Sequence, residues 1–143
     1  MNKQQTTAKE YLMKAYRVDE RIQNKLMQVD SLSTLATKAT TTISDMPGSP
    51  SKDPHKLENI VVKIVELQEE IGGDIEKLLV LKKDILGKIR CIEDPELQMV
   101  LELRYLSYLT WEHIAAKMGY SVDNIFILHR KALEKMTIPE ALQ

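Results

Sequence analysis

The sequence predicts an all-α protein in which two long amphipathic helices, as an antiparallel hairpin or a coiled coil, precede a bundle with a helix-turn-helix. The composition favours helices over sheets, because aromatic residues make up only 5% of the 143 residues and glycines number five. Apolar residues recur every three or four positions over two long stretches. Near the carboxyl end, two short amphipathic segments flank the turn sequence Met-Gly-Tyr-Ser at positions 118–121. We therefore expect almost no strand.

The first long helix is predicted from about residue 8 to residue 39. Steps of three and four place its apolar residues on one stripe. The members of this stripe are Ala15, Val18, Ile22, Leu26, Val29, Leu32 and Ala36. A flexible, exposed linker is then predicted at residues 40–54, because a run of threonines is followed by three prolines within eight residues.

The second long helix is predicted from about residue 55 to residue 90, with the three-four spacing of a coiled-coil seam. The seam contains Leu57, Ile60, Ile64, Leu67, Ile71, Ile75, Leu78, Ile85 and Ile89, with Lys82 as a polar exception. Gly72 and Gly73 interrupt it at a cost of roughly 1 kcal/mol each relative to alanine, so we expect a kink or a close helix crossing there. The two seams can close within one chain or between two, and a homo-oligomer such as a dimer is expected. Residues 1–92 are thus predicted to form a hairpin or coiled-coil region.

Residues 93–143 are predicted to form a separate helix-turn-helix domain. Asp94 followed by Pro95 is a typical helix start, and this helix should extend to Ser107. Thr110 can cap the next helix, and Gly119 can end it in a left-handed conformation.

The last helix of this domain, capped by Ser121, would be the one that reads DNA. Its predicted buried side is formed by Ile125, Leu128, Ala132, Leu133 and Met136. Its more exposed residues would face a groove of the double helix. Arg130 and Lys131 suit phosphates or guanine, and Asn124 suits adenine. The candidate DNA-binding residues are Thr110, Lys117, Ser121, Asn124, Phe126, Ile127, Arg130 and Lys131.

Four segments of this region resemble region four of sigma-70 family factors. They are Val100-Leu101-Glu102-Leu103-Arg104-Tyr105, Leu109-Thr110-Trp111-Glu112-His113-Ile114-Ala115, Met118-Gly119-Tyr120-Ser121 and His129-Arg130-Lys131-Ala132-Leu133. The region is most similar to that of small phage- and prophage-encoded proteins of Gram-positive bacteria, some of which are regarded as late-transcription regulators. The resemblance implies a DNA-reading second helix and, for sigma factors, contact with RNA polymerase and the promoter −35 element. Where such helices usually carry Lys or Arg, this one has Phe126 and Ile127.

The net negative charge of the chain disfavours DNA binding. The whole chain has a net charge of −1, and residues 93–143 hold five basic and eight acidic side chains, a net charge of −3. Two functions are therefore weighed. The first is a transcriptional regulator that binds double-stranded DNA, and the second is a protein-interaction module that docks on RNA polymerase or another regulator through an apolar patch at Phe126 and Ile127.

Catalysis, cofactors and metals have no support in the sequence. His113, His129 and Cys91 do not stand at ligand spacing, and His129 is expected to pack at the helix edge or donate to a phosphate. Five acidic residues on the second helix are expected to form a solvated face rather than a catalytic pair. They are Glu66, Glu69, Glu70, Asp74 and Glu76. Without a secretory signal, a membrane-spanning run or a second cysteine, a cytoplasmic protein that is not an enzyme is expected.

Overall fold

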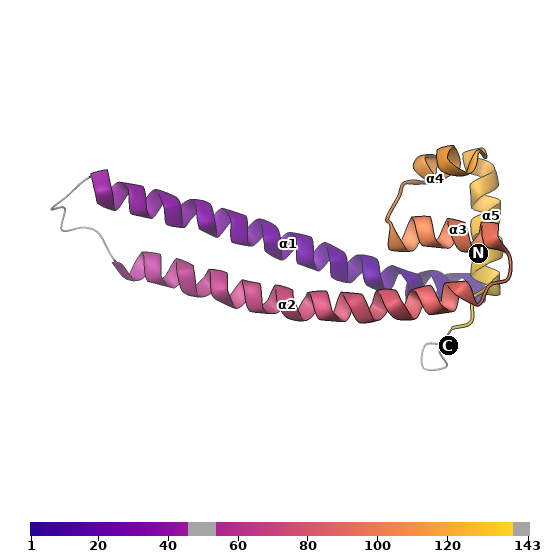
Figure 1. The fold of residues 1–143 in the computed structure, drawn as a ribbon, viewed down its shortest axis with the longest axis horizontal. Helices are drawn as coiled ribbons and strands as arrows, with labels where there is room; N and C mark the ends of the chain where they lie inside the picture. Colours follow the sequence, from indigo (N-terminus) through magenta and orange to yellow (C-terminus); the bar gives the residue numbers. More distant parts are fainter. Residues whose placement is uncertain (46–53, 139–143) are drawn as a thin grey trace. The chain divides into compact units, whose positions relative to one another are not determined.

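The computed structural model describes residues 1–45 and 54–138, with side chains described for 1–40 and 55–138. Six helical elements follow one another: α1 (Lys3–Asp45), α2 (Pro54–Arg90), α3 (Pro95–Leu101), the π-helical segment η1 (Glu102–Leu106), α4 (Trp111–Met118) and α5 (Val122–Lys135). No strand occurs in the two described ranges, and the all-α prediction is confirmed. Figure 1 shows α1 in indigo to purple, α2 in magenta to coral and the short helices in orange to yellow.

The long helices extend further than predicted. α1 continues through the threonine run to Asp45, so the predicted linker is wrong for residues 40–45, and residues 46–53 lie outside the described residues. β-Branched threonines lower helix propensity only slightly, and the hydroxyls of several in this part of α1 donate back to carbonyls one turn earlier, as Thr40 does to Ala36 at 3.0 Å. α2 begins at Pro54, a residue well suited to a first helical turn.

The chain divides into two compact units, which are described separately. Residues 1–18 and 77–143 form the terminal unit, and residues 19–76 form the middle unit. The sequence predicts that a separate domain begins after residue 92, and this boundary stays a prediction.

In the middle unit, α1 and α2 of the same chain lie side by side and run in opposite directions (Figure 1). Ile22 on α1 and Leu67 and Ile71 on α2 are buried. Beside them Lys25 Nζ lies 2.7 Å from a carboxylate oxygen of Asp74, and both side chains are at most one-fifth exposed. A charged pair in an apolar seam selects one helix register, because a shifted register would bury either charge without its partner.

Three predictions about this seam are wrong in detail. Leu26 is 41% exposed and Lys25 takes its place, while Ile75 is 43% exposed and Asp74 continues the stripe four-three after Leu67 and Ile71. Asp74 therefore does not belong to a solvated acidic face. The helical spacing placed Leu26 and Ile75 in the seams, and the pairing of Lys25 with Asp74 could not be predicted from either helix alone.

The two glycines do not mark a close crossing. α2 is continuous through Gly72 and Gly73, and a Cβ built at either position would meet no atom within 4 Å outside the helix's own backbone.

The core of the terminal unit joins the first turns of α1 to α5 and the residues that follow it up to Ile138. Four clusters of apolar side chains meet: one each from α1, from the end of α2, from α3 and η1, and from α5 and the residues after it. They are Ala8, Tyr11, Leu12 and Ala15; Ile85, Ile89 and Ile92; Leu97, Leu101 and Tyr105; and Ala132, Leu133, Met136 and Ile138. The α1 hydroxyl of Tyr11 donates to the Asp84 carboxylate of α2. The sequence did not predict that the amino-terminal segment completes this core.

Polar contacts fasten the same segment to α5. The side-chain amides of Gln4 and Gln5 donate to the carbonyl oxygens of Met136 at 2.8 Å and Arg130 at 3.1 Å. Carbonyls at the end of a helix have no partner within the helix, so the donor from Gln4 to Met136, the residue that caps α5, stabilises its end.

The helix predicted from Pro95 to Ser107 is present but changes geometry partway. Asp94 caps it as predicted, with its side chain accepting from the Glu96 amide. From Glu102 the helix widens into a π-helical turn, and the Ser107 amide donates to the Glu102 carbonyl at 3.1 Å.

Lys82, the polar exception in the α2 seam, has partners beside this turn. Its Nζ donates to the Leu106 carbonyl at 3.2 Å and lies 4.7 Å from the centre of the Tyr108 ring. Tyr108 has φ of +59°, a left-handed conformation that is uncommon for an aromatic residue. The contact with Lys82 helps to hold it there.

Candidate nucleic-acid interface

The turn between α4 and α5 is built from residues whose local preferences match their positions. Thr110 precedes α4 and its hydroxyl oxygen accepts from the His113 amide at 3.2 Å. Gly119 ends α4 with φ of +74°, which glycine adopts without a Cβ penalty. Ser121 then caps α5, its oxygen accepting from the Asn124 amide at 3.1 Å. The predicted roles of Thr110, Gly119 and Ser121 in the turn are confirmed.

A second apolar core holds α4 and α5 on α3. It consists of Val100 from α3, Ile114 and Ala115 from α4 and Ile125 from α5, all buried. Complete burial of an aliphatic side chain contributes about 1.5–3 kcal/mol to the free energy of unfolding. This small cluster therefore stabilises the packing of α4 and α5 on α3. The small side chain of Ala115 permits close helix approach, as its position in the sequence suggested.

α5 has the predicted division into a buried and an exposed side. Ile125, Ala132, Leu133 and Met136 are buried and Leu128 is half-buried. On the other side Ile127 is 43% exposed, and Arg130 and Lys131 are exposed. Asn124 is half-buried and lies one turn before Ile127. Residues three and four apart are neighbours on a helix surface, so Asn124, Ile127, Arg130 and Lys131 form one face.

Phe126 is not part of a free apolar patch. Its ring packs edge-on against Trp111 with 5.2 Å between ring centres, and its side chain is half-buried. The Arg104 guanidinium lies 4.3 Å from the centre of the Trp111 ring and donates to the Leu109 carbonyl at 2.9 Å. Phe126 therefore helps to fix the start of α4, and of the two apolar residues singled out earlier only Ile127 is well exposed.

His129 is a core residue, contrary to the expectation that it packs at a helix edge or donates to a phosphate. It is 6% exposed, and its Nε2 shares a 2.6 Å hydrogen bond with the Tyr105 hydroxyl. Trp111 packs edge-on against its ring with 4.7 Å between ring centres. A histidine on the inner side of α5 faces η1 and α4 rather than solvent, and no sequence pattern identifies Tyr105 as its partner.

This environment keeps His129 uncharged at neutral pH. Burial, and after it the positive charges of Lys9, Arg104 and Arg130, together lower the pKa of the imidazole to about 4. His129 thus acts as a neutral hydrogen-bonding group that links α5 to η1.

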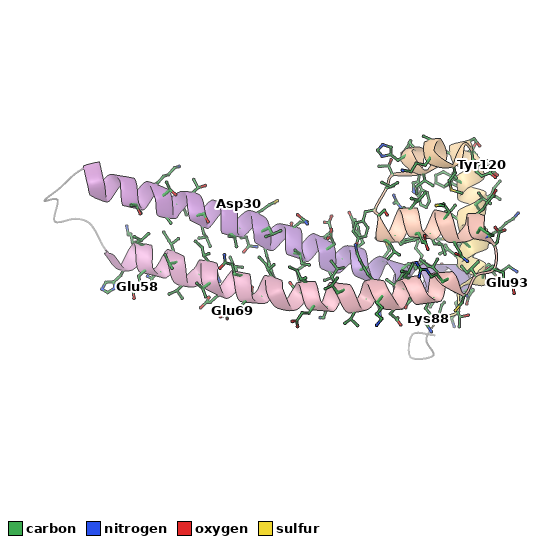
Figure 2. All side chains as sticks on the ribbon, in the orientation of Figure 1. Asp30, Glu58, Glu69, Lys88, Glu93 and Tyr120 are labelled. Carbon is green, nitrogen blue, oxygen red and sulfur yellow. The ribbon has the colours of Figure 1, made fainter. Side chains whose placement is uncertain are left out.

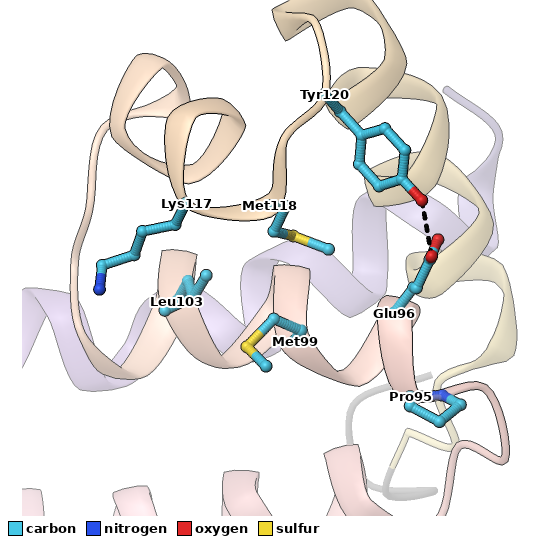
Figure 3. Close-up of a pocket in the computed structure, with 7 residues that line it drawn as sticks. All are labelled: Pro95, Glu96, Met99, Leu103, Lys117, Met118 and Tyr120. Carbon is cyan, nitrogen blue, oxygen red and sulfur yellow. Dashed lines mark hydrogen bonds between the residues drawn. The ribbon is translucent and has the colours of Figure 1, made fainter.

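A groove beside the turn was not predicted from the sequence. It encloses about 470 Å³, and Met99, Leu103 and Met118 form its apolar floor (Figure 3). At one end the Tyr120 hydroxyl donates to the Glu96 carboxylate at 2.6 Å, and at the other the Lys117 side chain lies over Leu103 (Figure 3). Lys117, a predicted DNA contact, therefore borders this groove rather than the exposed face of α5.

The terminal unit contains no group of three metal-ligating side chains placed to hold an ion, and the same holds for the rest of the described chain. None of the helices in the described ranges has both the length and the apolar character needed to cross a bilayer.

The fold and the turn geometry define an all-α protein with a helix-turn-helix near its carboxyl end. The chain belongs to the DUF1492 family, which is described as a protein family of unknown function and whose sequence model matches residues 48–137. The match takes in α2 to α5, so α1 lies outside it. Searches among curated proteins and among solved structures found no match to this chain.

Proposed function

We propose that the protein is a DNA-binding transcriptional regulator whose α5 enters the major groove. The observation that carries this proposal is the exposed face formed by Asn124, Ile127, Arg130 and Lys131 on the second helix of a helix-turn-helix. The resemblance of this region to sigma region four and to phage or prophage regulators supports the same function. The family match neither supports nor opposes it.

Each residue of the interface has a distinct chemical role in this proposal. Arg130 and Lys131 neutralise phosphates, and the Asn124 amide can pair with adenine. Ile127 can contact a thymine methyl group. The hydroxyls of Thr110 and Ser121 use an oxygen lone pair for capping, so each keeps its proton for a phosphate oxygen.

Two acidic residues of α5 limit the strength of this binding. Asp123 and Glu134 are exposed on the same helix, and both repel phosphates. Few phosphate contacts predict a shallow dependence of log K on log salt concentration, with a slope of roughly −2 to −5 per subunit.

Reversing both positive charges, Arg130→Glu with Lys131→Glu, is expected to weaken DNA binding by at least about 100-fold at low salt and to reduce the salt slope by about 2. Fluorescence anisotropy with labelled promoter fragments over a salt series measures both quantities. The matched control is Lys83→Glu with Arg90→Glu, two exposed basic residues of α2 outside the interface. Equal loss in both variants, or no binding by the unmodified protein at low salt, contradicts the proposal.

The groove favours a second candidate function, a module that docks on RNA polymerase or another regulator. Its apolar floor and the acidic character of residues 93–143 suit an apolar protein segment better than a polyanion. RNA polymerase is named here only because the resemblance to sigma region four implies it.

Under this alternative, Met99→Asp is expected to abolish co-purification with polymerase, because it places a carboxylate on the apolar floor of the groove. Met99 is 46% exposed, so the substitution leaves both cores intact. Met27→Asp, at a still more exposed methionine of the middle unit, serves as the control. The alternative also requires that co-purification survives Arg130→Glu with Lys131→Glu, and loss in that variant argues for DNA-dependent association.

A further inference from the structure

α2 carries a second apolar stripe that the hairpin does not use. Its members in the middle unit follow the four-three spacing of a coiled-coil seam: Val61, Val65, Gln68, Gly72 and Ile75. This outer stripe is offset from the buried seam of the same helix, whose members include Leu67 and Ile71.

The outer stripe is uncovered in the single chain. Val61 and Val65 are each 47% exposed and Ile75 is 43% exposed. Gln68 and Gly72 between them are exposed as well, and a Cβ at Gly72 would meet no atom within 4 Å. Three aliphatic side chains in register on one solvated helix face indicate a surface that is buried in an assembly.

Charge distinguishes this stripe from the rest of the α2 surface. No charged residue falls at its five positions, whereas Glu58 and Glu69 lie on the side of α2 away from α1 (Figure 2). Val62 is 51% exposed but is not in register with the stripe. A stripe without basic residues gives nucleic acid no electrostatic attraction, and its heptad spacing fits another helix.

We propose that the outer stripe pairs with the same stripe of a second copy of this chain, in antiparallel orientation, about a two-fold axis near residue 70. In this register Val65 packs against the partner's Ile75, and Gln68 lies opposite the partner's Gly72. In the layers next to the axis the long side chain of Gln68 then meets glycine, and in the layers beyond them Val65 and Ile75 fill the space between the helices. This inference does not rest on the proposed DNA binding.

The parallel alternative fits less well. In a parallel pair, each of Gln68 and Gly72 would lie opposite the same residue of the second chain. One layer would then bury two amides, and the next would contain a void. The self-complementarity of the antiparallel register is the reason for assigning the stripe to a second copy rather than to an unrelated helix.

The first test is the mass of the full chain in solution, measured by light scattering over a wide range of protein concentration. The expected result is a dimer of the 16.4 kDa chain that Val65→Glu converts to monomer. Val62→Glu is the matched control, since it makes the same change at a neighbouring and equally exposed valine, and it should remain dimeric. Circular dichroism checks that both variants stay helical. A monomeric unmodified chain at every concentration, or a dimer that survives Val65→Glu, overturns the proposal.

The second test reads the orientation directly by disulfide cross-linking in a Cys91→Ser background, which removes the exposed thiol. A chain with Val65→Cys and Ile75→Cys should form covalent dimers on oxidation, while either single variant should not. In the antiparallel register the two copies of residue 65 are about 15 Å apart along the helix axis, too far for a disulfide. Covalent dimers from Val65→Cys alone indicate parallel pairing and overturn the antiparallel assignment. Both tests are made without DNA, so their outcome is independent of the DNA-binding experiment.

Discussion

Replacing Leu12 by alanine is expected to lower the free energy of unfolding of the terminal unit by about 3 kcal/mol. Leu12 is completely buried and belongs to the core that also contains Leu133 at the far end of α5. The lost side chain leaves a cavity that the surrounding helices can close only in part. Since a domain of this size typically has about 5–15 kcal/mol of stability, the expected loss is a large fraction of the whole.

Denaturant unfolding followed by tryptophan fluorescence measures this effect, because Trp111 is the single tryptophan of the chain. Trp111 begins α4 and lies 99 positions after Leu12 in the sequence, so a shifted transition reports on the amino-terminal contribution to the helix-turn-helix. Val80→Ala is the control: Val80 is 69% exposed in the same unit and lies outside the outer stripe, and its truncation should change stability by no more than about 0.5 kcal/mol. An unchanged Trp111 transition in Leu12→Ala would show that the first turns of α1 do not support α4 and α5.

Lowering the pH from 7 to 4 is expected to reduce the free energy of unfolding by about 3 kcal/mol through His129 alone. The unfolded imidazole has its ordinary pKa of 6.5, whereas burial lowers the pKa to about 4 in the folded protein. Between these two values the unfolded state binds a proton that the folded state does not, so stability falls as the pH falls. The contribution is complete above pH 6.5 and is lost by about pH 4.

His129→Gln separates this contribution from the titration of carboxylates, because glutamine can donate to or accept from the Tyr105 hydroxyl but does not titrate. The variant starts less stable at neutral pH, and the difference from the unmodified protein should narrow by about 3 kcal/mol on acidification to pH 4. Parallel stability curves for the two proteins over that range would contradict the assignment. Nuclear magnetic resonance titration of the His129 ring gives the folded pKa directly.

Local features of the fold were predictable from sequence because each depends on a few neighbouring residues. Thr110, Gly119 and Ser121 act through their own backbone conformation and the next helical turn, so reading them in order was sufficient. The same is true of Asp94 and Pro95 at the start of α3. Helical spacing likewise gave the buried and exposed sides of α5.

Contacts between distant segments could not be predicted in this way. The spacing of apolar residues along α1 does not specify which other helices Leu12 packs against. Its place in the terminal core could therefore not be predicted. On its own helix, each of Lys25 and Asp74 resembles a surface charge. Only the packing of α1 against α2 brings the two side chains together in the seam. His129 and Tyr105 are a further case, since a histidine on the inner side of α5 has no partner until η1 is placed.

The interface itself was partly predictable. The exposed positions Ile127, Arg130 and Lys131 follow from the period of α5, whereas the groove over Met99 depends on how α4 lies on α3. The half-burial of Phe126 could not be predicted from the helical period of α5, because it results from the edge-on contact with Trp111.

The attachment of the first residues of α1 to the end of α5 also determines when this protein can finish folding during synthesis. Gln4 and the carbonyl of Met136 are 132 positions apart in the sequence, so all the residues between them must be synthesised before that contact can form. Helices of the nascent chain can form within microseconds, but closing so long a loop is slower. Until then the apolar side of the first turns of α1 remains open to chaperones and to other chains. A segment that is synthesised long before α5 is therefore among the last to reach its final position.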